Sequence, residues 1–203
     1  MIALWSGVLR AVPGSRLQMA GMPANGAPEE LLQWFAAEGI AEDRLIFYPR
    51  SGFSEYLKLH NQVDFCLDTF PYTGGTTTLH ALWMGVPTLT IGGHAYPSYQ
   101  GALMLHQVGL EDYFVANNKE DFIIKALFLV KNQIFLQDAR FKLRNYLVDG
   151  YSASLKAVVD SFSLAFQMTW QGWCEGEKPR SIRIDNSDIN FDPCFVNYSD
   201  VIQ

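Results

Sequence analysis

A short segment near the middle of the chain combines a glycine pair with three hydroxyl side chains. Gly74 and Gly75 are followed by Thr76, Thr77 and Thr78, and a helical pattern begins at Thr76. The first turn of a helix presents N–H groups without intrahelical partners and the positive end of the helix dipole, so it binds phosphate oxygens without needing a lysine. Glycines let the backbone approach such oxygens closely, and threonine hydroxyls add donors. The segment therefore predicts a diphosphate-binding turn.

The same residues also have a purely structural explanation. Threonine caps helix N-termini well and paired glycines are common in loops, so the turn could serve packing alone. The preceding residues 64–68 favour ligand binding, because they form a short apolar strand by composition. In open α/β sheets ligands bind beyond the carboxyl ends of the strands, and the turn leaves its strand at that end.

Two hydrophobic periods alternate along the chain, as they do in β-α units stacked on a parallel sheet. Short apolar runs predict strands, and stretches with apolar residues three and four positions apart predict helices. We expect an α/β fold with a Rossmann-like parallel sheet flanked by helices and a helical C-terminal extension. The predicted strands are 17–20, 44–47, 64–67 and 88–91, and the predicted helices are 2–11, 28–38, 53–61, 76–84, 98–108, 120–131, 135–147 and 152–171.

The length of 203 residues is enough for one domain with a sizeable core. We expect that domain over residues 1–180, followed by a polar, aperiodic tail at 181–203. A β-α-β domain normally begins with the strand that feeds its first helix, whereas here a helical pattern starts at Ile2. We therefore expect the chain to begin within a domain whose first strand is missing.

The composition narrows the classes of partner. A formal net charge of −6 disfavours the basic surface that nucleic acids and anionic membranes require. No apolar run is long enough for a membrane span, and the N-terminus lacks the features of a signal peptide. Cys66, Cys174 and Cys194 form no C-x-x-C pair and have no histidine at metal-ligand spacing. We expect a cytoplasmic protein with free thiols, no metal site, and neither nucleic acid nor membrane as a partner.

The central block is similar to a known family. Residues 64–87, DFCLDTFPYTGGTTTLHALWMGVP, resemble the central block of the O-linked N-acetylglucosamine transferase and SPINDLY family, glycosyltransferase family 41. The resemblance extends upstream through residues 44–47 and downstream to residues 170–179, so that it covers residues 2–182. It implies the nucleotide-sugar-binding, C-terminal half of a GT-B glycosyltransferase.

The resemblance implies metal-independent, inverting transfer of a sugar to a Ser or Thr hydroxyl of a protein acceptor. The expected donor is a UDP-sugar, namely UDP-N-acetylglucosamine, and no cofactor is expected. The absence of an Asp-x-Asp motif agrees with the family's metal independence. The family's N-terminal catalytic domain and tetratricopeptide repeats have no counterpart in the sequence. The chain alone is therefore expected to be inactive, and no catalytic base is assigned.

The resemblance also assigns donor-binding roles around the turn. Thr76 and Thr77 fall on the donor diphosphate, within the turn that also includes Gly74, Gly75 and Thr78. His80, one helical turn later, falls where family members contact the ribose. Some members carry Asp at this position, and a capping or surface role is the alternative for the histidine.

The segment before the central block corresponds to the family's uracil-binding segment. Ser51 falls at the position whose backbone reads the base edge, and Tyr56 at the position that stacks on the base, with a core role as its alternative. A family lysine that meets the phosphates falls on Phe53, so Arg50 is a candidate replacement unless it is solvated. His94 is a further candidate, in a loop that faces the sugar in the wider family, although loop histidines are often merely exposed.

Two other readings of the sequence stay open. A non-catalytic nucleotide-binding or interaction module would keep the same turn without transferring a sugar. A flavodoxin-like receiver domain has the same layers, but it requires an acidic cluster and a late lysine that we do not find. Trp170 and Trp173 are spaced for packing, and we do not assign them to a sugar site.

Overall fold

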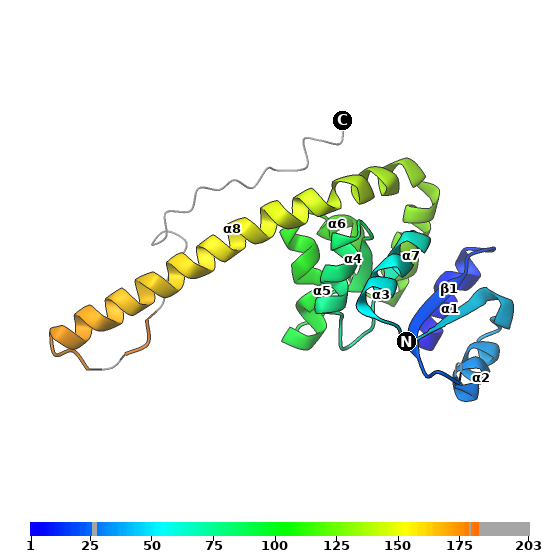
Figure 1. Ribbon diagram of the computed structural model, residues 1–203, viewed down its shortest axis with the longest axis horizontal. Coiled ribbons are helices and arrows are strands. Elements are labelled where there is room, and N and C mark those ends of the chain that lie inside the picture. Colours follow the sequence, from blue (N-terminus) through cyan, green and yellow to red (C-terminus); the bar gives the residue numbers. More distant parts are fainter. Residues whose placement is uncertain (26–27, 179, 183–203) are drawn as a thin grey trace. The chain divides into compact units, whose positions relative to one another are not determined.

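The computed structural model describes residues 1–25, 28–178 and 180–182. The chain divides into two compact units, Met1–Leu147 and Val148–Gln203 (Figure 1). The expected tail at 181–203 lies outside the described residues from position 183 onwards, as does Cys194. All residues predicted to bind the donor belong to the first unit.

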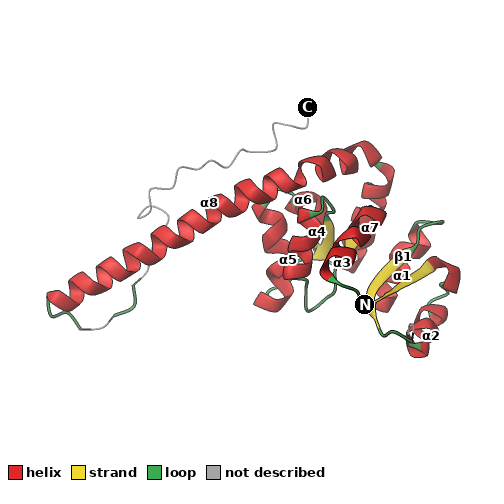
Figure 2. Cartoon of the chain, viewed as in Figure 1, coloured by secondary structure: helices red, strands yellow, loops and turns green. Residues whose placement is uncertain are grey.

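Every strand of the first unit pairs in parallel, as expected (Figure 2). Strand β1 (Leu17–Met22) pairs with β2 (Leu45–Pro49) in one sheet. Strands β3 (Cys66–Leu67), β4 (Thr88–Ile91) and β5 (Val115–Ala116) form the other sheet in that order. The α/β class with parallel strands and flanking helices is confirmed, but the strands form two sheets, because the described residues show no ladder between β1 and β3.

Helices connect and follow the strands in the predicted alternation. The short helix α6 and the strand β5 were not predicted, and the two helices predicted at 135–147 and 152–171 are parts of one helix, α8. The helices are α1 (Ile2–Ala11), α2 (Glu29–Ala37), α3 (Phe53–Leu59), α4 (Thr76–Trp83), α5 (Tyr96–Gln107), α6 (Glu111–Phe114), α7 (Lys119–Lys131) and α8 (Gln133–Cys174), with two 3₁₀ turns, η1 (Glu42–Arg44) and η2 (His60–Gln62).

Helix α1 contributes to the cores of both sheets. Its residues Leu4 and Val8 pack with Leu89 and Ile91 of β4 in one apolar cluster. Leu9, on the next part of the helix surface, packs with the side chains of α2 and β2 in a second cluster, which contains Phe35, Ile40 and Leu45. Burial of these side chains away from water is the main force that holds the first unit together.

Strand β4 is the buried centre of the sheet that carries the predicted site. All four residues from Thr88 to Ile91 are buried, as expected for a strand covered on both faces. A buried threonine hydroxyl needs a partner, and that of Thr90 donates a hydrogen bond to Asp68 at 2.8 Å. Strand β4 therefore contacts Asp68, the first residue after β3, through the Thr90 side chain as well as through a backbone hydrogen bond.

The second unit is described by itself as the C-terminal part of α8 and the residues that follow. Its helix carries many exposed apolar side chains. Trp170 and Trp173 are among them, at 68% and 74% exposure, so their predicted packing role stays a prediction. The others include Leu155, Val158, Val159, Phe162 and Phe166.

Candidate functional site

The predicted diphosphate turn lies where β3 ends and α4 begins. Gly75 is the N-cap residue of α4, and no side chain caps this end of the helix. Thr76 and Thr77, the first two helical residues, are exposed, whereas Thr78 is 2% exposed. This helix N-terminus therefore lacks a side-chain cap and begins with two exposed threonines, which suits an anion-binding turn.

The turn leaves no room for a side chain at Gly74. A Cβ atom built there would lie 2.5 Å from the Thr78 Oγ1 and 2.8 Å from the Thr77 Oγ1. Neither Gly74 nor Gly75 has a positive φ, so the reason for glycine here is space rather than backbone conformation. The hydroxyls of Thr77 and Thr78 thus bend back over the backbone of Gly74.

Asp68, the first residue after β3, is buried beneath this turn. Its Oδ1 accepts hydrogen bonds from the backbone N–H groups of Gly74 and Thr69, both at 2.8 Å, and its Oδ2 accepts one from the Thr90 hydroxyl. Burial raises the pKa of the Asp68 carboxyl, and the hydrogen bonds from Gly74, Thr90 and Thr69 act in the opposite direction. The backbone carbonyl of Asp68 also accepts a hydrogen bond from the Trp5 indole at 3.2 Å.

Thr73 joins the turn to the start of α5. Its backbone N–H and its hydroxyl both donate to the carbonyl oxygen of Pro97, at 2.9 and 3.1 Å. The same hydroxyl accepts a hydrogen bond from the backbone N–H of Gly101. Thr73 is fully buried, so its polar atoms are satisfied inside the protein. The turn is therefore fixed from two sides, by Asp68 and by Thr73.

Three aromatic rings gather beside the helix that begins at the turn. The His80 ring of α4 lies 5.2 Å from the Phe53 ring and 5.6 Å from the Tyr56 ring of α3, in edge-to-face arrangements. Tyr56 is half-buried and Phe53 is 63% exposed. The His80 Nδ1 is buried and has no hydrogen-bond partner among the described residues. The structure thus brings together the residues predicted to bind base and ribose.

A second histidine backs this aromatic group. The His60 ring lies 5.1 Å from the Tyr56 ring, and its Nδ1 lies 3.2 Å from the Leu57 carbonyl oxygen. Burial lowers the pKa of His60, with a smaller contribution in the same direction from His80. Burial also raises the pKa of the Tyr56 hydroxyl. Both pKa shifts favour the uncharged forms of His60 and Tyr56, and an uncharged aromatic surface suits the face of a nucleobase.

The remaining predicted residues lie on the surface. Ser51, Arg50 and His94 are exposed. The backbone N–H of Arg50 donates to the Met22 carbonyl oxygen at 2.9 Å, but its guanidinium makes no hydrogen bond or ion pair within the described residues. Their assignments to base, phosphate and sugar stay predictions.

Gln100 is a site residue that the sequence analysis missed. Its side-chain Oε1 lies 2.7 Å from the position that a Cβ of Gly75 would occupy. Helix α5 thus places a carboxamide against the N-cap residue of α4. No local sequence signal could have found it, because Gln100 follows Gly75 by a whole β-α unit. Asp68 could have been noticed, since an acidic residue directly after a buried strand faces the carboxyl edge of the sheet.

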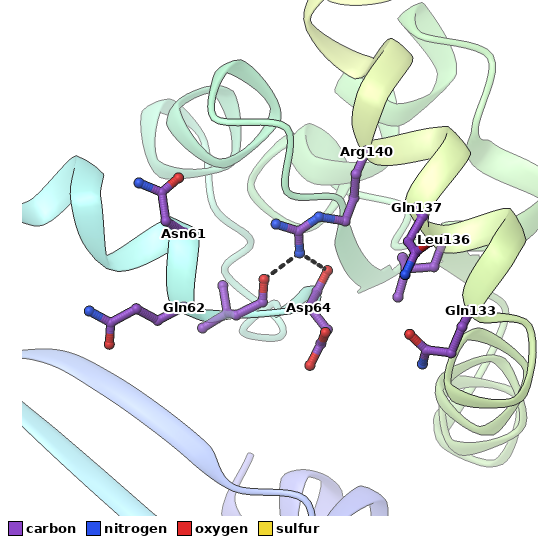
Figure 3. A pocket seen from close by; sticks show the side chains of 8 residues that line it. Asn61, Gln62, Asp64, Gln133, Leu136, Gln137 and Arg140 are labelled. Carbon is purple, nitrogen blue, oxygen red and sulfur yellow. Dashed lines mark hydrogen bonds between the residues drawn. The ribbon is translucent and has the colours of Figure 1, made fainter.

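A polar hollow of about 290 Å³ lies elsewhere in the first unit, and Figure 3 shows the side chains that line it. Residues 61–64, which precede β3, line it together with the beginning of α8. The Arg140 guanidinium donates to the carbonyl oxygens of Val63 and Asp64. The hollow therefore lies at the amino end of β3, whereas the glycine turn follows its carboxyl end. We assign Arg140 to holding the start of the strand rather than to the donor site.

Across residues 1–25, 28–178 and 180–182, no three His, Cys, Asp or Glu side chains gather as a metal site would require. In the same ranges, no helix combines the length and the apolar character that spanning a membrane takes.

Comparisons with known proteins agree with the geometry. A family model described as "Glycosyl transferase family 41" matches residues 1–157. The chain is 28% identical over 200 residues to the "Probable UDP-N-acetylglucosamine--peptide N-acetylglucosaminyltransferase SPINDLY" of Oryza sativa subsp. japonica, covering 97% of this chain and 21% of that protein. For the protein of the same name from Arabidopsis thaliana, the identity is 27% over 198 residues, covering 95% of this chain and 22% of that protein.

A solved structure is similar as well. An O-GlcNAc transferase mutant of Thermobaculum terrenum superposes with a TM-score of 0.73 at 28% sequence identity, covering 86% of this chain and 34% of that one. The chain spans about a fifth of the length of the curated relatives it matches.

Proposed function

Because this chain belongs to glycosyltransferase family 41, we propose that it is the donor-binding part of a glycosyltransferase. The proposed reaction moves N-acetylglucosamine from UDP-N-acetylglucosamine to a Ser or Thr hydroxyl of a protein, with inversion and without a metal. The relatives' names support the donor and the peptide acceptor. A cytoplasmic location, expected from the sequence, stays part of the proposal.

The main support for the proposal is the arrangement of helix α4 and the aromatic rings beside it. Helix α4 starts with the exposed residues Thr76 and Thr77 and carries His80, whose ring contacts Tyr56 and Phe53. A diphosphate at the start of α4 would therefore place the attached nucleoside beside aromatic faces. The start of α4 would thus bind the diphosphate, and the aromatic group one helical turn later would bind the nucleoside.

The proposed contribution of this chain to catalysis is electrostatic. When the sugar leaves, negative charge accumulates on the departing UDP diphosphate. The N–H groups and the dipole at the start of α4 are already oriented there and would stabilise that charge. The acceptor-binding surface and the catalytic base would be supplied by residues beyond those described, as the greater length of the relatives suggests.

Nucleotide binding can be measured by titration calorimetry on the 203-residue chain, with UDP as the ligand and GDP as its control. We expect UDP to bind more tightly than GDP, and the affinity for UDP to rise at least about tenfold, or 1.4 kcal/mol, when the chain is extended upstream to the length of its relatives. Equal affinity for UDP in both lengths would show that the site is not shared with other segments. No binding of UDP in either would overturn the proposal.

A non-catalytic nucleotide-binding module is the second candidate, and one residue favours it. Phe53, exposed beside His80, occupies the position of a family lysine that meets the phosphates, so one charge that would support sugar transfer is absent. Release of UDP from UDP-N-acetylglucosamine by the extended protein, measured with and without peptide acceptors, separates the two. Binding without peptide-dependent UDP release would establish the second candidate.

A further inference from the structure

The Asp68 carboxylate connects the donor turn to the end of β3 and to the neighbouring strand β4. The carboxylate is 8% exposed and accepts three hydrogen bonds, from Gly74, Thr69 and Thr90. We infer that Asp68 is a positioning residue that holds the diphosphate turn in its binding shape, without touching the ligand itself. This inference rests on the proposed function, because it concerns the same site.

The two oxygens of the carboxylate hold different parts of the structure. Oδ1 binds the N–H groups of Thr69 and Gly74 at 2.8 Å and so closes the loop between them. With its N–H turned inward, Gly74 leaves the outward donors of the turn to the residues that begin α4. Oδ2 binds the hydroxyl of Thr90 on the neighbouring strand at 2.8 Å. Through Asp68, the turn is therefore anchored to the buried strand β4.

Helix α5 fixes the carboxylate from the third side. A Cβ atom on Gly101 would lie 2.6 Å from the Asp68 Oδ2 and 3.2 Å from the Thr90 Oγ1. Only glycine lets the helix approach so closely at this place. The backbone N–H of the same Gly101 donates to the hydroxyl of Thr73, the residue directly before Gly74. Strand, turn and helix thus meet at one acidic side chain.

A purely stabilising role would explain this arrangement poorly. Burial raises the pKa of the Asp68 carboxyl, which means that holding it ionised inside the protein is unfavourable. Buried charges are weak contributors to stability, and neutral side chains of similar size often serve as well. What the carboxylate provides is one side-chain oxygen that accepts from two backbone N–H groups, which fixes the geometry of a loop that binds an anion.

Four proteins test the inference by titration calorimetry with UDP and with uridine: the natural chain, Asp68→Asn, Asp68→Ala and Phe35→Leu. Asp68→Asn keeps an oxygen that can accept from both N–H groups, and Asp68→Ala removes it. Phe35 is fully buried in the cluster with Leu9 and Leu45, so Phe35→Leu lowers stability without touching the turn. Thermal unfolding is recorded for each.

We expect Asp68→Ala to weaken UDP at least about tenfold and uridine by less than about threefold, with Asp68→Asn within about threefold of the natural chain for both ligands. Phe35→Leu should lower the melting temperature and leave both affinities unchanged. Equal losses for UDP and uridine in Asp68→Ala, or losses that follow melting temperature across all four proteins, would overturn the inference. Absence of UDP binding to both the natural chain and the protein extended upstream would overturn the proposed function, and this inference with it.

Gly101→Ala provides a second route should Asp68→Ala not fold. The added methyl group pushes on the carboxylate from α5, while alanine itself is the better helix-forming residue. We expect weaker UDP binding and unchanged uridine binding. Unchanged UDP affinity in a folded Gly101→Ala protein would show that displacement of the Asp68 carboxylate does not alter the turn.

Discussion

Thr73 donates twice to the carbonyl oxygen of Pro97, from its backbone N–H and from its hydroxyl. One residue belongs to the glycine turn and the other to the start of α5, whose preceding loop carries His94. The two segments after β3 and β4 therefore share one fixed point. A ligand that contacts both the glycine turn and the loop before α5 would therefore bind two segments whose relative position is fixed by these hydrogen bonds.

The hydroxyl of Thr77 should contribute to nucleotide binding and not to folding. Thr77 is exposed at the start of α4, so Thr77→Val removes a donor at nearly constant volume. We expect a loss of roughly 1 to 3 kcal/mol in UDP affinity with little change in melting temperature. Thr169→Val, on the exposed surface of α8, is the control and should alter neither quantity. An unchanged affinity with a clearly lower melting temperature would mean that Thr77 is a structural cap.

Tyr56 should act on the base alone. Tyr56→Ala removes a ring that contacts His80 and Phe53, and we expect it to weaken UDP by roughly 1 kcal/mol while inorganic diphosphate binds as before. Tyr56→Phe keeps the ring and should bind UDP normally. Equal weakening of UDP and diphosphate by Tyr56→Ala would instead identify Tyr56 as a core residue. Titration calorimetry with both ligands decides this.

A lysine at position 53 should strengthen binding. Phe53 is exposed beside the His80 ring, so a longer cationic side chain there can approach a diphosphate at the start of α4. We expect Phe53→Lys to raise the affinity for UDP by roughly 1 kcal/mol at low ionic strength, and the gain to shrink as salt is added. Phe53→Met, which adds no charge, should give no gain. A gain that does not depend on salt would contradict the electrostatic explanation.

Cys66 should resist alkylation where Cys174 reacts. Burial raises the pKa of the Cys66 thiol to about 11, with a smaller contribution from the charge of Asp68, whereas Cys174 is exposed. Because the thiolate is the reactive form, iodoacetamide near pH 8 should modify Cys174 and leave Cys66 intact until the protein unfolds. Mass spectrometry of the separated peptides measures each site. Rapid modification of Cys66 in the folded protein would contradict the raised pKa of its thiol.

The same thiol makes stability depend on alkaline pH. Its pKa is raised from 9.0 to about 11 in the folded state, so the folded protein keeps a proton that the unfolded chain loses. The stabilisation is fully present below pH 9.0 and is lost as the pH rises through about 11. Urea unfolding across this range should show a falling free energy of unfolding. The fall should be smaller in Cys66→Ala, which cannot ionise.

The elements that the sequence predicted best have a clear period and clear ends. Helix α1 at Ile2–Ala11 and strand β4 at Thr88–Ile91 were predicted with these bounds, and Pro and Gly residues mark where each one stops or starts. Strand β5 has two residues and α6 has four, too few to show a period. Helix α8 was predicted in two parts around Gly150, but a single glycine within a helix costs only about 1 kcal/mol.

The site was predictable where it is local. The glycine turn, its threonines and the family resemblance all lie within one stretch of sequence, and the family is confirmed. The contact of His80 with Tyr56 and Phe53, the support from Asp68 and Thr73, and the approach of Gln100 depend on how separate segments pack. Such contacts are set by the tertiary fold, and one sequence carries no direct record of them.

Helix α1 gives the first unit its cooperativity. Within the part of the chain that the structure describes, the two sheets share no ladder of hydrogen bonds, yet Leu4 and Val8 belong to one apolar cluster and Leu9 to the other. Neither sheet can lose its core without exposing part of the same helix to water. Heating should therefore melt both sheets together in one transition, as if they were continuous. A substitution of Leu9 alone, such as Leu9→Ala, should divide this single thermal transition into two, one for each sheet.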